Sequence, residues 1–138
     1  MGEKRKRIAV MVDYLTSEYS EELLAGVSKC CEENDVDLLN LVCGELRHHG
    51  KDASYQYVSV TSLVRDNLVD GVIFTSGTQM HHVSQDFFVD YVNRFNIPAT
   101  VNVSALLPGI HSVVADGTKS FSDLVENLSG CHFLARVL

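Results

Sequence analysis

The sequence predicts a doubly wound α/β fold, in which a parallel sheet carries helices on both faces. Short apolar runs alternate along the chain with longer segments whose apolar residues have helical spacing, as expected of strands joined by crossover helices. The run Val72-Ile73-Phe74 follows an Asp70-Gly71 turn and is apolar throughout, which is typical of a strand buried on both faces. Because crossovers between parallel strands are right-handed, we expect the flavodoxin-like strand order 2-1-3-4-5.

Each expected element has a local signature. The strand segments are short and apolar: Arg7–Tyr14, Asp37–Cys43, Val72–Phe74, Ala99–Val103 and Ile110–Ala115. The helical segments run from a cap at Thr16 or Ser17 to Asn34-Asp35, from Tyr57 to Leu68, from Phe87 to Phe95 and from Phe121 to Leu128. Two polar stretches that contain glycine, Gly44–Ser54 and Gly77–His82, are expected to be loops, and His132–Leu138 is a last apolar run.

Size and charge limit the possible functions. A chain of 138 residues with 46% hydrophobic residues is long enough for one domain with a core. A net charge of −7 argues against a non-specific nucleic-acid surface, which needs clustered Lys and Arg. We expect residues 1–6 to be a basic tail and residues 7–138 to be the folded domain. No apolar run approaches the roughly 18 residues that span a bilayer, so we expect no membrane contact and a cytoplasmic location.

Cysteines and paired histidines do not predict a metal site. Cys30, Cys31, Cys43 and Cys131 lack C-x-x-C spacing, so buried reduced thiols are expected. His48-His49 and His81-His82 fall in expected loops, where neighbouring side chains diverge and solvated histidines are the better prediction. No cofactor-binding motif of the G-x-G-x-x-G or G-x-x-x-x-G-K-[ST] type occurs, and we expect no cofactor.

The order of short motifs resembles the ligand-binding region of LacI/GalR-type regulators, a periplasmic-binding-protein-like fold. The motifs that carry the resemblance are Ile8–Val12 followed by Tyr19–Gly26, Asp37-Leu38-Leu39, Val69–Ile73, Asn96–Ala99, Ser112–Asp116 and Val125–Leu128. Each motif alone is weak, and their shared order over residues 7–138 makes the resemblance. It implies a non-enzymatic sensor lobe that binds a small polar effector, such as a sugar or related metabolite.

Two departures from this family affect the expectation. Only six residues precede Arg7, where the family carries its DNA-reading helices, so we expect no DNA-reading element in this chain. The chain also ends where the family's first lobe ends, so we expect a first (N-terminal) lobe, truncated before a second one. The resemblance implies lobe closure on the effector, a homodimer, no nucleic-acid contact by this chain and an output domain elsewhere. That output could be transcription control, a histidine kinase or a cyclic-dinucleotide (diguanylate) cyclase.

The candidate binding site lies at the carboxyl ends of the strands, where open α/β sheets bind ligands. The side chains expected there could accept or donate hydrogen bonds to effector hydroxyls, and the tyrosines could stack on an apolar ring face. They are Asp13, Tyr14, Ser17, Tyr19, Thr75, Ser76, Asn102 and Asp116. The alternative for Asp13 and Thr75 is a capping or turn role, and Tyr19 could belong to the core.

Three other functions fit the sequence less well. A phosphoacceptor receiver domain needs an Asp at the end of the third strand, where this chain has Thr75-Ser76. FMN binding favours a phosphate loop rich in glycine and hydroxyl residues, whereas the stretch from Asp13 to Glu18 has two acids and no glycine. A hydrolase lacks its G-x-S-x-G elbow. The main alternative left open is a self-contained flavodoxin-like enzyme or binding protein that uses the same crevice. A third is a dimerisation module that binds no ligand.

Overall fold

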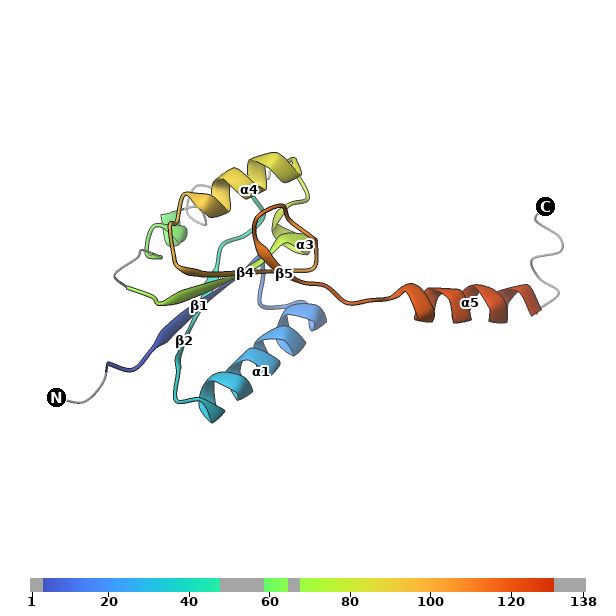
Figure 1. The fold of residues 1–138 in the computed structure, drawn as a ribbon, viewed down its shortest axis with the longest axis horizontal. Helices are drawn as coiled ribbons and strands as arrows, with labels where there is room; N and C mark the ends of the chain where they lie inside the picture. The colour runs from blue at the N-terminus through green and yellow to red at the C-terminus, as the bar shows by residue number, and fades with distance from the viewer. Residues whose placement is uncertain (1–3, 48–58, 65–67, 131–138) are drawn as a thin grey trace.

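The computed structural model describes residues 4–47, 59–64 and 68–130. Its strands are β1 (Arg7–Val12), β2 (Asp37–Val42), β3 (Gly71–Thr75), β4 (Ala99–Val103) and β5 (His111–Val113). They form one five-stranded parallel sheet in the order β2-β1-β3-β4-β5 (Figure 1). This arrangement confirms the predicted α/β fold and its 2-1-3-4-5 strand order.

The centre of the sheet is apolar on both faces, as the sequence of β1 requires. Ala9 through Val12 are completely buried, and Met11 pairs in register with Leu41 of β2 and Phe74 of β3. A central strand covered on both faces has no side for polar residues. That is why the pattern of β1 and β3 is a continuous apolar run and not an alternation.

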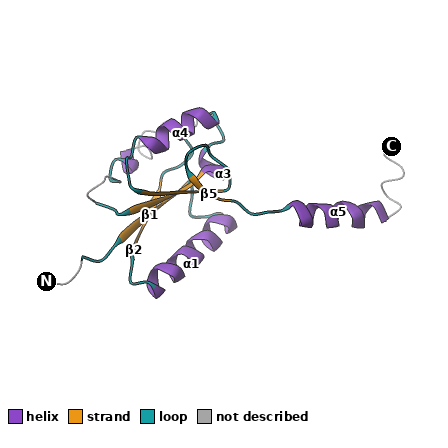
Figure 2. Ribbon diagram, viewed as in Figure 1, coloured by secondary structure: helices purple, strands orange, loops and turns teal. Residues whose placement is uncertain are grey.

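Helices lie on both sides of the sheet. Figure 2 shows α1 (Glu18–Glu33) on one side and α3 (Ser76–Gln79) with α4 (Gln85–Asn93) on the other. Ser17 and Ser84 cap α1 and α4, because their hydroxyl oxygens accept hydrogen bonds from the amides of Ser20 and Phe87. A further helix, α5 (Thr118–Gly130), projects away from the sheet at the end of an extended linker.

Most of the core lies between the sheet and α4. Phe74 of β3 contacts Phe88, Tyr91 and Phe95 with ring centroids 5.4–6.3 Å apart in edge-to-face geometry. Such aromatic pairs add to the stability that burial provides. Phe88 and Tyr91 lie on one face of α4, and Phe95 follows just after its end, so this side of the segment packs against β3.

Several predicted elements differ in detail. The expected Gly77–His82 loop begins with a short helix, α3, in which the Met80 amide donates to the Ser76 carbonyl. The fifth strand is shorter than predicted, because only His111–Val113 pair with β4. Cys30 is exposed and not buried, since the α1 face turned toward the sheet carries Cys31 instead.

Some predictions fall outside the described residues. The expected second helix is described at 59–64, where 59–61 are helical, and at Leu68, which lies in a turn. Cys131, His48-His49 and the last apolar run, His132–Leu138, lie outside the described part of the chain. Among the residues that are described, no helix is both long and apolar enough to cross a bilayer.

Candidate strand-end site

The end of β1 and the start of α1 form one corner of the predicted site. Asp13 directly follows β1 and is only 7% exposed. Its Oδ1 lies 3.5 Å from the Ser20 hydroxyl, and its carbonyl accepts a hydrogen bond from the Gly44 amide. Ser17 accepts from the Ser20 amide at 3.1 Å. Asp13 and Ser17 thus hold the loop between β1 and α1 in place.

A buried polar network joins the ends of β3 and β4. The Ser76 amide donates to Oδ1 of Asn102 at 3.2 Å, and the Ser76 hydroxyl donates to the Val103 carbonyl at 3.0 Å. The amide nitrogen of the Asn102 side chain donates to the Ala105 carbonyl at 2.6 Å. Thr75, Ser76 and Asn102 are each at most 1% exposed. In this structure their side chains position the strand-end loops and do not face solvent.

Thr75 links the same edge back to the first strand. Its hydroxyl donates to the Met11 carbonyl at 3.0 Å and lies 3.2 Å from the Thr78 hydroxyl. The carboxyl ends of β1, β3 and β4 are therefore connected by side-chain hydrogen bonds in addition to the sheet ladder. Such cross-links keep the edge rigid, which favours precise placement of the groups around it.

Tyr19 and Ser104 form an exposed pair next to this network. The Tyr19 hydroxyl lies 2.7 Å from the Ser104 hydroxyl, and 42% of Tyr19 is exposed. Ser104 has a positive φ of 95°, and a Cβ atom added at Gly77 would come within 2.7 Å of the Ser104 Cβ. Ser104 was not among the eight predicted site residues, although its place directly after β4 is the signal that locates it.

Asp116 and Tyr14 complete the predicted set. Asp116 is exposed and lies in the linker that follows β5, where its Oδ1 accepts the Thr118 amide at 3.0 Å. Hydrogen bonds from the Thr118 side chain and backbone lower the Asp116 pKa below its ordinary value. Tyr14 follows Asp13 and is partly buried. Because its pKa is lowered, Asp116 remains a carboxylate at neutral pH, and its bond to the Thr118 amide caps the start of α5.

Gln79 is a buried polar residue that the sequence analysis did not single out. It is completely buried at the end of α3, and its side-chain oxygen and nitrogen both lack a hydrogen-bond partner among the described residues. Its carbonyl accepts the Leu46 amide at 3.1 Å. The sequence signal was the polar run Thr75–Gln79 directly after a buried strand, which places Gln79 beside the strand ends.

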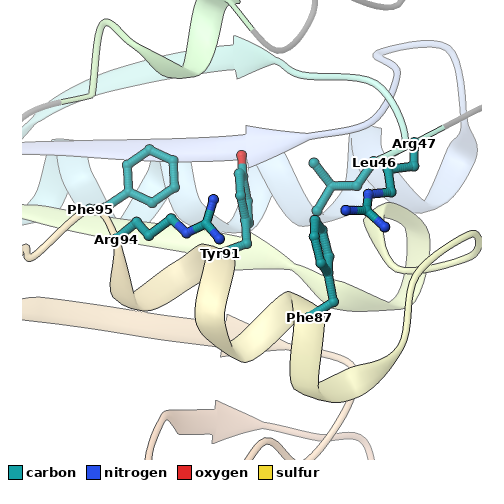
Figure 3. A pocket seen from close by; sticks show the side chains of 6 residues that line it. All are labelled: Leu46, Arg47, Phe87, Tyr91, Arg94 and Phe95. Atoms are coloured by element: carbon teal, nitrogen blue, oxygen red, sulfur yellow. The ribbon is translucent and has the colours of Figure 1, made fainter.

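A separate aromatic pocket lies at α4, away from the predicted residues (Figure 3). It has a volume of about 330 Å³ and is lined by Leu46, Arg47, Phe87, Tyr91, Arg94 and Phe95. The Arg47 guanidinium lies 4.0 Å from the centroid of the Phe87 ring, which is a cation–π contact. Burial raises the pKa of Tyr91, so this phenol stays protonated at neutral pH.

The histidines of the loop after α3 are paired with an acid. Nε2 of His82 lies 2.8 Å from Oε2 of Glu45, and Nδ1 of His81 lies 3.8 Å from Oε1 of the same carboxyl group. Both rings are exposed. Within the described ranges, no group of three or more His, Cys, Asp or Glu side chains is arranged to hold a metal ion.

The fold and the strand-end geometry define a flavodoxin-like doubly wound domain with a polar carboxyl edge. Comparison with known protein families, with curated proteins and with solved structures found no match. The resemblance to LacI/GalR-type ligand-binding regions therefore stays a prediction that depends on the motifs in the sequence.

Proposed function

We propose that this chain is a ligand-sensing lobe that binds a small polar effector, such as a sugar or related metabolite, at the carboxyl edge of its sheet. The lobe acts in the cytoplasm without catalysing a reaction. It makes half of the binding site, and a second lobe closes over the effector. The resulting state passes to an output domain outside this chain.

The observation that carries the proposal is a difference in exposure: some polar side chains at the strand ends are buried and hydrogen-bonded, and others are exposed. Ser76 and Asn102 hydrogen-bond to each other, and Thr75 bonds to the Met11 carbonyl, which fixes the edge. Tyr19, which bonds to Ser104 next to this network, is exposed, and Asp116 is exposed in the linker that follows β5. A rigid polar base with accessible hydroxyl and carboxylate groups is suited to hydroxylated ligands. An aromatic ring adds an apolar face on which a sugar ring can pack.

The proposed mechanism is a population shift between open and closed lobes. A ligand shifts that equilibrium only by its differential contacts in the closed state. The buried network at β3 and β4 contributes by keeping the half-site in one geometry, so that ligand binding does not have to order it. An isolated lobe, with half of the contacts, is expected to bind weakly.

Thermal unfolding against a panel of hexose epimers tests this proposal. Sugars at high concentration stabilise proteins non-specifically through exclusion from the surface, so an increase that one epimer gives beyond the others indicates specific binding. We expect one or more epimers to raise the Tm beyond the common increase. Ligand at about ten times its Kd adds roughly 1.4 kcal/mol of stability, which corresponds to a Tm increase of about 3–6 °C for a domain of this size.

A matched pair of variants separates the site from general effects. Asp116→Asn removes a carboxylate acceptor and keeps a residue that can cap α5. Asp90→Asn removes the same charge from the exposed side of α4. The proposal requires that the epimer-specific shift disappears in Asp116→Asn and persists in Asp90→Asn. Equal shifts for all epimers in the wild-type chain would contradict it.

A further inference from the structure

The aromatic pocket at α4 (the α4 pocket) carries a cationic side chain at each end. Phe87 and Tyr91 of α4, and Phe95 just after it, supply the aromatic rings that line the pocket. In Figure 3 the guanidinium groups of Arg94 and Arg47 lie on either side of the Tyr91 and Phe87 rings. The α4 pocket therefore combines apolar walls with two positive charges, and its lining shares no residue with the proposed effector site.

The two arginines of the α4 pocket are not neutralised by acidic side chains. Arg5 and Arg7, by contrast, form ion pairs with N–O distances of 3.1–3.8 Å. In the described part of the chain neither Arg47 nor Arg94 forms such a pair, although Asp90 precedes Arg94 by about one helical turn. Positive charge left unpaired in a chain of net charge −7 creates a local potential that attracts an anion.

The backbone at Arg47 adopts a conformation that only a specific local requirement maintains. Its φ is 55°, in the left-handed region that residues other than glycine rarely occupy. The amide of the preceding Leu46 donates to the Gln79 carbonyl at 3.1 Å, which fixes the loop, and the Arg47 guanidinium lies 4.0 Å from the centroid of the Phe87 ring. Such backbone conformations concentrate at ligand-binding sites. Arg47 is thus held at the rim of the α4 pocket.

The rings that line the α4 pocket are fixed by the core behind them. The ring centroids of Tyr91 and Phe95 lie 5.2 Å apart, and those of both residues lie 5.4–6.1 Å from the ring centroid of the buried Phe74. A pocket with preformed walls binds a ligand without having to order its own side chains. Its volume of about 330 Å³ is at the lower end for small-molecule sites, which suits a ligand of one or two rings.

We propose that the α4 pocket binds a small aromatic carboxylate. The ring of the ligand packs against the aromatic walls formed by Phe87 and Tyr91. Its carboxylate accepts charge-assisted hydrogen bonds from the guanidinium groups of Arg47 and Arg94, which match the geometry of a carboxylate. This site is separate from the proposed effector site, so either proposal can fail without the other.

Titration of the isotope-labelled full chain with benzoate and with indole-3-acetate, followed by nuclear magnetic resonance, tests this proposal. Each acid is compared with its neutral amide, benzamide or indole-3-acetamide, which has nearly the same shape. We expect at least one carboxylate to bind with a Kd of about 1 mM or lower, as ligands of this size allow, and to perturb amide signals of Arg47 and of Phe87–Phe95. The matching amide should bind roughly 10-fold more weakly, because it lacks the charge.

Variants of the two arginines separate anion recognition from general apolar binding. Arg47→Gln and Arg94→Gln change exposed side chains, and each should weaken binding of the carboxylate by roughly 10-fold. Lys29→Gln removes the same charge from an exposed position of α1 and should retain the wild-type affinity. Circular dichroism checks that the variants are folded. The proposal is overturned if neither carboxylate perturbs these signals, if acid and amide bind equally, or if both arginine variants bind like the wild-type chain.

Discussion

The Ser76 amide donates a hydrogen bond to Oδ1 of Asn102 across 3.2 Å, and this bond joins the start of α3 to the buried strand β4. The same side chain donates to the Ala105 carbonyl at 2.6 Å. A single amide group thus sets the position of the two loops that leave β3 and β4. This relationship makes the carboxyl edge of the sheet rigid.

Replacing Asn102 by Ala should therefore destabilise the fold. The substitution leaves the Ser76 amide and the Ala105 carbonyl without their side-chain partner in a buried region, and each loss costs about 1–3 kcal/mol. We expect a total decrease of roughly 2–4 kcal/mol in the free energy of unfolding, measured with urea. Asn93→Ala, at an exposed position of α4, is the control and should change stability by no more than about 0.5 kcal/mol.

Two glycines should respond to alanine in opposite directions. A Cβ atom at Gly77 would come within 2.7 Å of the Ser104 Cβ, whereas nothing lies within 4 Å of a Cβ at Gly26 in α1. Gly26→Ala should stabilise the chain by about 0.5–1 kcal/mol because alanine favours helix. Gly77→Ala should destabilise it by roughly 1–3 kcal/mol. If both substitutions change the free energy of unfolding in urea equally, the Gly77–Ser104 contact does not affect stability.

Asp70 should give the chain a specific dependence on acid. The Arg7 amide donates to its carboxylate at 2.8 Å, and this bond, with the nearby Lys6 charge, lowers the Asp70 pKa. A lowered folded pKa adds stability above the unfolded value of about 3.9, and that stability disappears as the pH falls through the folded pKa.

Urea unfolding at a series of pH values measures this contribution. In Asp70→Asn the stability should fall less steeply below about pH 4 than in the wild-type chain. Asp90→Asn lies on an exposed face of α4 and should retain the wild-type slope. If the stability of Asp70→Asn depends on pH as steeply as that of the wild-type chain, the Asp70 carboxylate contributes nothing to stability.

The cysteines should differ sharply in reactivity. Burial raises the pKa of Cys43 to about 12, and it raises the pKa of Cys31 as well. Cys30 is exposed. Because the thiolate is the reactive form, iodoacetamide at pH 8 should label Cys30 in the folded chain and leave Cys43 unmodified. Peptide mapping by mass spectrometry checks this order, and labelling of Cys43 only in urea is the required control.

Sequence patterns predicted the fold well because its strands are local and strongly marked. β1 and β3 are apolar on both faces, so their composition alone identifies them as central strands of a parallel sheet. That topology then placed Asp13, Thr75 and Asn102 at the same edge. Cys30 of α1 was predicted to be buried and is exposed, whereas the adjacent Cys31 is buried, because neighbouring residues of a helix point in different directions.

The roles of the site residues were harder to predict because they depend on contacts between distant segments. Thr75 satisfies a carbonyl 64 positions away, and Ser76 and Asn102 satisfy each other across 26 positions. No local pattern states that these side chains are buried. The burial of Gln79 and the outward direction of α5 depend in the same way on three-dimensional packing.

Nuclear magnetic resonance mapping of hexose binding tests the central proposal most directly. The isotope-labelled full chain is titrated with the epimer panel at high concentration, where weak binding by half a site is still detectable. We expect one or more epimers to perturb amide signals clustered around Tyr14, Tyr19, Ser104 and Asp116, at the carboxyl edge. Perturbations that are absent for every epimer, or that cluster instead at the aromatic pocket of α4, would contradict it.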